Sequence, residues 1–216
     1  MQEFWDLIQQ FFTFFQPENI IRYGGLIFLL SVVFIENGLF FGFFLPGDSL
    51  MFTAGLLTAT GVLNHPFSLV LGGIFSAAVL GSSFGYYFGS KAGRNLYKRK
   101  DTFFFRKNHI AIAEQYYQHY GIRTLVIGRF LPVVRTFAPI VAGIVKMPFA
   151  TFMLANVGGA AAWVGSLVSL GYFLGRVWPD AEHYLGYIIF GLIIITAIPV
   201  IRTYLKARAG KNKPSI

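Results

Sequence analysis

The sequence has no cysteine and few charged residues. Of its 216 residues, 18 are basic and 9 are acidic, which amounts to 12% of the chain, whereas roughly a quarter of the residues in a soluble globular domain are charged. The absence of cysteine excludes a disulfide scaffold and a thiolate metal site. Hydrophobic residues make up 55% of the chain, so a disordered protein is excluded as well. This composition does not fit an ordinary soluble domain.

Long stretches without any Asp, Glu, Lys or Arg account for the low charge. They are Ser49–Ser90, Met147–Gly175 and His183–Ile201. A helix needs roughly 20 mostly apolar residues to cross the hydrocarbon core of a membrane, and each stretch is about that long or longer. The sequence therefore predicts an all-α integral membrane protein with several crossings.

The net charge of +9 is concentrated in a few segments. Basic residues gather in Lys91–Lys107 and from Arg202 onward, whereas Met1–Ile21 and Arg176–Glu182 carry more acidic than basic residues. Because cytoplasmic loops are enriched in Lys and Arg, we expect the 91–107 loop and the C-terminus to be cytoplasmic. The N-terminus and the 176–182 loop are then outside. The basic excess follows the topology, and no nucleic-acid partner is expected.

Three short motifs recur with one common spacing, 86 residues. Phe44-Leu45-Pro46 recurs as Phe130-Leu131-Pro132, Gly72-Gly73 as Gly158-Gly159, and Gly85-Tyr86-Tyr87-Phe88-Gly89 as Gly171-Tyr172-Phe173-Leu174-Gly175. Glycine and aromatic residues are abundant here, so one match would mean little, but three in register indicate a duplication. The charge distribution makes the helix near 67–90 end inside and the helix near 149–175 end outside. This predicts an inverted-topology repeat, which is typical of transporters whose substrate binds near the membrane midplane.

Helix-breaking residues interrupt the apolar sequence of the first half. Pro46 and Gly47 should break the helix, and Asp48-Ser49 should cap a helix that resumes at Leu50. The segment Leu50–Ala59 would be only about 15 Å long at 1.5 Å per residue. It is therefore predicted to be a re-entrant half-helix that does not cross the membrane.

The second half is interrupted in the same way. Its breaks fall around Arg129, Pro132, Arg135, Pro139 and Gly143, and Ile140–Val145 is again too short to cross. Irregular backbone at membrane depth is tolerated only where protein or a water-filled cavity satisfies its polar groups. Both loops are therefore expected to face an interior cavity, with Pro46, Gly47, Pro132, Pro139 and Gly143 shaping the hairpins.

The predicted organisation follows the two repeats. We expect an N-terminal interfacial helix in 1–18, a first repeat in 19–90 (a crossing near 20–43, a hairpin and a crossing), a basic cytoplasmic loop and interfacial helix in 91–120, a second repeat in 121–176 (a hairpin and a crossing), a final crossing in 183–203 and a basic tail in 204–216. The fold would thus hold two opposed re-entrant hairpins, about four transmembrane helices and two interfacial amphipathic helices.

Four charged residues lie inside otherwise apolar sequence: Glu36, Asp48, Arg129 and Arg135. Ionisable groups at membrane depth cost a few kcal/mol each or more and usually serve function. One alternative is that the two acids and the two arginines form two static ion pairs that pin the hairpins together. In the functional interpretation, the arginines grip a phosphate. The acids then gate the site or carry protons as their arginine partners move.

The remaining sequence supports neither a metal site nor a catalytic centre. The four histidines are scattered, and no metal-binding motif is present. We therefore predict no metal, no cofactor and no enzymatic activity. A homo-oligomer is compatible with the sequence.

The motifs resemble those of the bacterial DedA family of the VTT-domain superfamily. The resemblance rests on Glu36, on Phe44-Leu45-Pro46-Gly47-Asp48-Ser49, on Gly128-Arg129-Phe130-Leu131-Pro132-Val133-Val134-Arg135-Thr136 and on Ala142-Gly143. It covers about residues 20–176. One departure is visible, because many members have Asp where this chain has Ser82.

The resemblance implies an inner-membrane lipid carrier with two opposed re-entrant hairpins. Family members are implicated in returning undecaprenyl phosphate across the membrane or in moving phospholipids, with links to the proton-motive force. Glu36, Asp48, Arg129 and Arg135 match the essential positions of the family. We therefore expect a transporter of a phosphate-bearing lipid. An intramembrane polyprenyl-phosphate phosphatase and a proton-coupled small-solute transporter are the alternatives.

Overall fold

The protein is all-helical over the part of the chain that the computed structural model describes. This part comprises residues 17–39, 42, 45–96, 122–130 and 132–178, together with 184, 187 and 191. Its helices are α2 (Pro17–Gly38), α3 (Gly47–Ala59), α4 (Phe67–Leu96), α6 (Ile122–Gly128), α7 (Pro132–Ile144) and α8 (Phe149–Val177). The prediction of an all-α fold is confirmed for these residues, among which no strand occurs. The expected interfacial helices, the final crossing and the tail lie almost wholly outside them.

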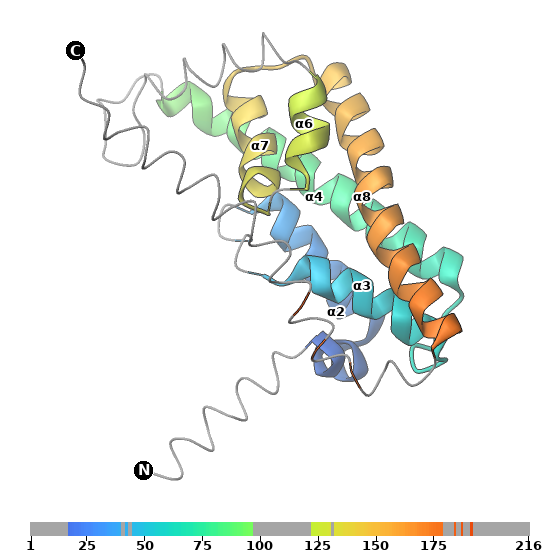
Figure 1. Ribbon diagram of the computed structural model, residues 1–216. Helices are drawn as coiled ribbons and strands as arrows, with labels where there is room; N and C mark the ends of the chain where they lie inside the picture. Colours follow the sequence, from blue (N-terminus) through green and yellow to red (C-terminus); the bar gives the residue numbers. More distant parts are fainter. Residues whose placement is uncertain are drawn as a thin grey trace, which may run out of the picture.

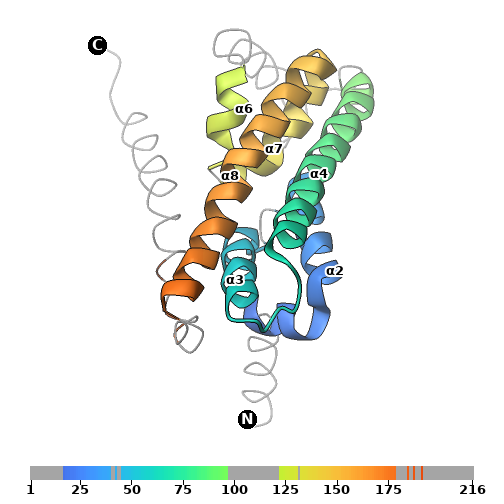
Figure 2. The same cartoon turned by 90° about the vertical axis from the view of Figure 1, so that its right-hand side faces the viewer.

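Two long helices form the frame of the molecule. Phe67–Lys91 of α4 and Phe149–Val177 of α8 are long and apolar enough to cross a membrane. The two helices run in opposite directions through the molecule (Figures 1 and 2). They match the crossings expected near 67–90 and 149–175.

Each long helix is preceded by a helical hairpin with a short second arm. The second arms, α3 and α7, have 13 residues each, which makes them about 20 Å long, against roughly 30 Å of hydrocarbon. Both begin near the middle of the molecule and end close to the start of the next long helix (Figure 2). The tips of the two hairpins therefore meet at the centre.

The short helices begin earlier than the sequence predicts. α3 begins at Gly47 rather than Leu50, and no side chain caps it; the Ser49 hydroxyl donates instead to the Pro46 carbonyl at 2.9 Å. α7 begins at Pro132 rather than near residue 140 and continues through Pro139. A proline fits the first turn of a helix, where its missing N–H needs no partner.

The first arm of the first hairpin is shorter than the predicted crossing near 20–43. α2 is kinked at Gly25, which has a φ of 62°, a left-handed conformation that glycine adopts without steric cost. The straight part, Gly25–Gly38, is shorter than a membrane crossing requires. Beyond it the chain turns back, and Gly42 lies against the backbone of Glu36.

Each short helix packs mainly on the long helix of the other half. α3 packs against α8, and α7 packs against α4. Glycines let the backbones touch: a Cβ on Gly55 would collide with the Val168 carbonyl, and a Cβ on Gly143 with the Tyr86 carbonyl. Each of these glycines follows an alanine, Ala54 or Ala142. The two halves are therefore interlocked.

Two tyrosines at equivalent positions of the repeat, Tyr86 and Tyr172, also join the two halves. The Tyr86 hydroxyl on α4 donates to the Met147 carbonyl at 2.5 Å, and its ring stacks on Phe152 near the start of α8. Tyr172 on α8 packs against Phe67 at the start of α4, with ring centroids 4.4 Å apart. Each tyrosine thus contacts the beginning of the other long helix.

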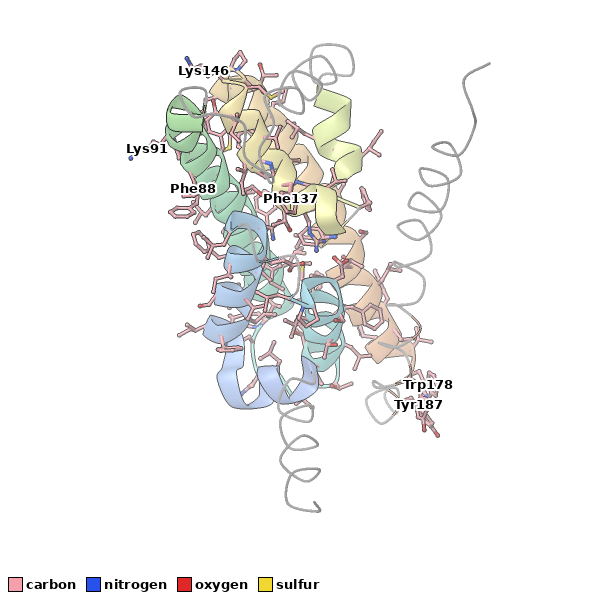
Figure 3. All side chains as sticks on the ribbon, turned by 90° about the vertical axis from the view of Figure 1, so that its left-hand side faces the viewer. Phe88, Lys91, Phe137, Lys146, Trp178 and Tyr187 are labelled. Atoms are coloured by element: carbon pink, nitrogen blue, oxygen red, sulfur yellow. The ribbon has the colours of Figure 1, made fainter. Side chains whose placement is uncertain are left out.

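Large apolar side chains also cover much of the outer surface. Leu154 and Phe173 on α8 are 67% and 64% exposed, and Phe88 points outward from α4 (Figure 3). Lys91 lies near one end of the molecule, and Trp178 lies at the other (Figure 3). An apolar flank between a basic and an aromatic end fits a protein surrounded by lipid.

Candidate functional site

The four interior charges meet at the tips of the two hairpins. Glu36 lies in the last turn of α2 and Asp48 in the first turn of α3, while Arg129 follows α6 and Arg135 lies in the first turn of α7. Glu36, Arg135 and Arg129 are 1%, 3% and 5% exposed. One hairpin therefore contributes two acids and the other contributes two arginines.

Arg135 takes both acids as partners. Its Nη1 donates to Asp48 Oδ1 at 2.5 Å, and its Nη2 donates to Glu36 Oε1. The guanidinium also lies over the ring of Trp163, with Cζ 4.1 Å from the ring centroid. Trp163 Nε1 donates to the same Asp48 oxygen at 3.1 Å. One side chain of α8 thus contacts both members of the ion pair that joins α3 to α7.

Arg129 has no acidic partner among the described residues. Its Nη2 donates to Ser82 Oγ at 3.0 Å and to Asn156 Oδ1, whereas Nη1 is buried without a hydrogen-bond partner there. The described residues therefore do not pair one acid with each arginine, although two ion pairs do join the hairpins, both of them on Arg135. The structure gives Arg135 two carboxylates and leaves Arg129 with neutral acceptors.

Three residues of this site are hard to identify from the sequence alone. Trp163 and Asn156 come from α8, and Ser82 comes from α4. Asn156 Nδ2 donates to the Val79 carbonyl at 3.1 Å and to Ser83 Oγ at 3.3 Å, which fixes its oxygen toward Arg129. In the sequence, Ser82 stands out only because it differs from the DedA pattern. In the structure, this same residue contacts Arg129.

The residues expected to shape the hairpins lie at or within the short helices. Pro46 and Gly47 mark the start of α3, Pro132 is the first residue of α7, and Pro139 and Gly143 lie inside α7. A Cβ on Gly47 would overlap the Glu36 carboxylate. The Pro-Gly pair therefore leaves room for the acid as well as turning the chain.

A small cavity adjoins both arginines. It is lined by Leu125, Arg129, Arg135, Ala138, Pro139, Phe152 and Asn156 and has a volume of about 10 Å³. That is close to the room that one water molecule needs. A phosphate group would therefore require the cavity to widen. No cluster of three metal-ligating side chains is present in the described part of the chain.

Comparison with known proteins identifies related membrane proteins. Protein DedA of Escherichia coli (strain K12) is 35% identical to this chain over 203 residues, covering 90% of this chain and 91% of that protein. An uncharacterized membrane protein of Mycobacterium tuberculosis (strain H37Rv) is 34% identical over 187 residues, covering 86% and 82%. Another, from Synechocystis, is 34% identical over 172 residues, covering 78% and 75%. No solved structure matches this chain.

A family model agrees with these relatives. The model described as the VTT domain matches residues 45–173, which is more than half of the chain. The matched segment includes Asp48, Arg129 and Arg135 together with both short helices. The sequence relationship and the domain match show that this membrane protein belongs to the DedA family of VTT-domain proteins.

Proposed function

We propose that the protein moves a phosphate-bearing lipid across the membrane, with undecaprenyl phosphate or a phospholipid as the substrate. The observation that carries the proposal is the meeting of two acids and two arginines at the buried tips of the two hairpins. Ionisable groups at this depth mark substrate or ion pathways in membrane proteins. The headgroup would pass through the centre while the lipid tails stay in the bilayer.

The fold supports a transporter of the inverted-repeat type. α4 and α8 run in opposite directions, and α3 and α7 point from the centre to opposite ends (Figure 2). If both hairpins are re-entrant, their tips meet near the membrane midplane, where such transporters bind their substrates. Each half would then open the centre toward one side of the membrane.

The contacts suggest separate roles for the charges. Arg129 and Arg135 would bind the phosphate, since a guanidinium can donate two hydrogen bonds to it. Glu36 and Asp48 hold Arg135 in the closed arrangement, and an anion that competes for Arg135 would have to separate these pairs. The two acids would act as the gate and, when released, as sites for a coupling proton.

The side chains at the two ends of the molecule suggest how the protein is oriented in the membrane. Lys91 and Lys146 lie at one end of the molecule, and Trp178 and Tyr187 lie at the other (Figure 3). With the basic end in the cytoplasm, the protein would sit in the bacterial inner membrane as a multi-pass protein, with its C-terminus cytoplasmic.

Reconstitution into liposomes tests the proposal. Purified protein should accelerate the transbilayer movement of a labelled lipid phosphate, and Arg135→Ala should abolish the acceleration. Arg129→Gln should lower the rate about tenfold or more, since it removes a charged hydrogen bond to the headgroup. Arg176→Gln is the matched control, because Arg176 is exposed at the end of α8.

Three results would count against this function. Wild-type protein that leaves lipid movement unchanged would contradict transport, and an Arg135→Ala variant as active as wild type would contradict the assigned roles. Release of inorganic phosphate from a polyprenyl phosphate or diphosphate would instead point to a phosphatase.

A further inference from the structure

Arg129 and Arg135 differ in how their charge is balanced. Arg135 donates to two carboxylates. Arg129 donates to a hydroxyl and an amide oxygen, and within the described residues it makes no ion pair. Both arginines are nearly inaccessible to solvent. The two positive charges of the site are therefore not equivalent.

A buried guanidinium without a counter-ion is unfavourable. Removing a charge from water costs several kcal/mol even after the surroundings relax, and neutral acceptors recover only part of that cost. Nη1 of Arg129 is buried and has no hydrogen-bond partner in the described part of the chain. Arg129 also lines the small cavity. An anion that reached Nη1 would supply the missing charge and the missing acceptor together.

Ser82 and Asn156 leave the charge of Arg129 available. They approach it from two helices, α4 and α8, and each contributes an uncharged oxygen. Since Ser82 Oγ lies 3.0 Å from Nη2, a carboxylate at this position would come within ion-pair distance. It would balance Arg129 much as Asp48 helps to balance Arg135.

From these contacts we infer that Arg129 is the residue that first binds the anionic headgroup and that Ser82 is a specificity-determining residue. The uncharged side chain of Ser82 leaves the positive charge of Arg129 unbalanced and available to the headgroup. The inference rests on the proposed function and deepens it. The headgroup meets the unbalanced charge of Arg129 first. Arg135 becomes available only after Glu36 or Asp48 has separated from it. The site thus selects lipids that carry a phosphate over uncharged lipids of the same chain length.

A pair of variants that differ in charge but hardly in size tests this inference. Ser82→Asp supplies a counter-ion to Arg129, and Ser82→Asn introduces a side chain of similar volume without charge. Binding of farnesyl phosphate and of farnesol is measured for both variants in detergent micelles. Ser82→Asp should bind farnesyl phosphate at least tenfold more weakly than Ser82→Asn, and both should bind farnesol alike. The same order is expected for lipid phosphate movement in liposomes.

A second variant covers the case in which Ser82→Asp does not fold. Asn156→Asp keeps the shape of the side chain and places a carboxylate on Arg129 from α8. Its affinity for farnesyl phosphate should also fall at least tenfold relative to wild type. Circular dichroism and gel filtration identify the variants that are folded.

The outcomes separate this inference from the proposed function. Equal farnesyl phosphate binding by folded Ser82→Asp and Ser82→Asn would overturn the inference, and so would undiminished binding by Asn156→Asp. If wild-type protein moves a lipid phosphate in the same preparations, the proposed function stands despite either result. If wild-type protein neither binds farnesyl phosphate nor moves a lipid phosphate, both fail.

Discussion

Arg135 lies between two buried carboxylates, so its removal leaves two acids facing each other without a cation. Breaking a buried ion pair from one side costs about 3–5 kcal/mol, and we expect Arg135→Gln to lose about that much stability. Arg129→Gln removes a buried cation that has no acidic partner among the described residues. Its lost hydrogen bonds, about 1–3 kcal/mol, are offset by relief of the desolvation cost of the charge, so the net loss should be smaller than for Arg135→Gln. Thermal unfolding in detergent, followed by circular dichroism, measures both effects.

A triple variant tests whether the two unpaired carboxylates cause the lost stability of Arg135→Gln. Adding Glu36→Gln and Asp48→Asn to Arg135→Gln removes the repulsion and should recover part of the lost stability. Equal destabilisation by Arg129→Gln and Arg135→Gln would contradict the pairing of both acids with Arg135 alone.

Trp163 contacts the ion pair in two separable ways. Trp163→Phe keeps an aromatic ring under Arg135 but loses the hydrogen bond to Asp48, which should cost about 1 kcal/mol. Trp163→Leu loses the ring as well and should cost about 1–2 kcal/mol more at this desolvated site. The midpoints of thermal unfolding should fall in that order. Trp178→Phe, at the exposed end of α8, should leave the midpoint unchanged, and an equal loss for Phe and Leu at position 163 would contradict the ring contact.

The sequence predicts some residues of the site better than others. Glu36 and Arg135 stand out because a charge within apolar sequence is visible without a structure. Asn156 and Ser82 do not stand out, because polar uncharged residues are common on the packing faces of membrane helices. Their function depends on Arg129, which lies on another helix and far away in the sequence.

At the scale of the helices, close backbone contact holds the interlocked halves together. Gly55→Ala would drive its new methyl group into the Val168 carbonyl on α8, and overpacking of this kind typically costs about 1–3 kcal/mol. Gly143→Ala should cost a similar amount, because α7 meets α4 in the same way. Both variants should unfold at lower temperature than wild type.

Gly165→Ala is the matched control on α8. Apart from Gly165 itself, its chain neighbours and the backbone of its own helix, no atom of the described residues lies within 4 Å of the Cβ position there, so the methyl group has room. Its unfolding temperature should equal that of wild type or exceed it, since alanine favours a helix over glycine. A loss at Gly165 as large as the loss at Gly55 would show that close packing is not the cause.

The bounds of the short helices were harder to predict than their existence. Pro46 and Pro139 suggested that regular helix resumes only after the charged residues, yet α3 and α7 already contain Asp48 and Arg135 in their first turns. The local sequence allows the earlier start of α7, since a proline fits the first turn of a helix and Pro132 is its first residue. In the structure, Asp48 and Arg135 bind each other across the centre.

For the whole molecule, the absence of cysteine allows a direct test of orientation. Lys91→Cys and Trp178→Cys place single thiols near opposite ends (Figure 3). A membrane-impermeant maleimide added to intact cells with a permeable outer membrane should label only the Trp178→Cys variant. In inside-out vesicles it should label only the Lys91→Cys variant. Labelling of both positions from one side would contradict a crossing by α4 or α8 in the proposed orientation.

The sequence by itself determined the class of the protein, the two long helices, the existence of the two short helices and the four charges within apolar sequence. These features follow from local composition, because hydrophobic runs, prolines and isolated charges affect the structure of their own segment, independently of distant residues. The tertiary structure decided which acid pairs with which arginine, and it left Arg129 beside Ser82 and Asn156 instead of a carboxylate. Only the packing of helices distant in sequence sets these neighbours, since each short helix lies on the long helix of the other half.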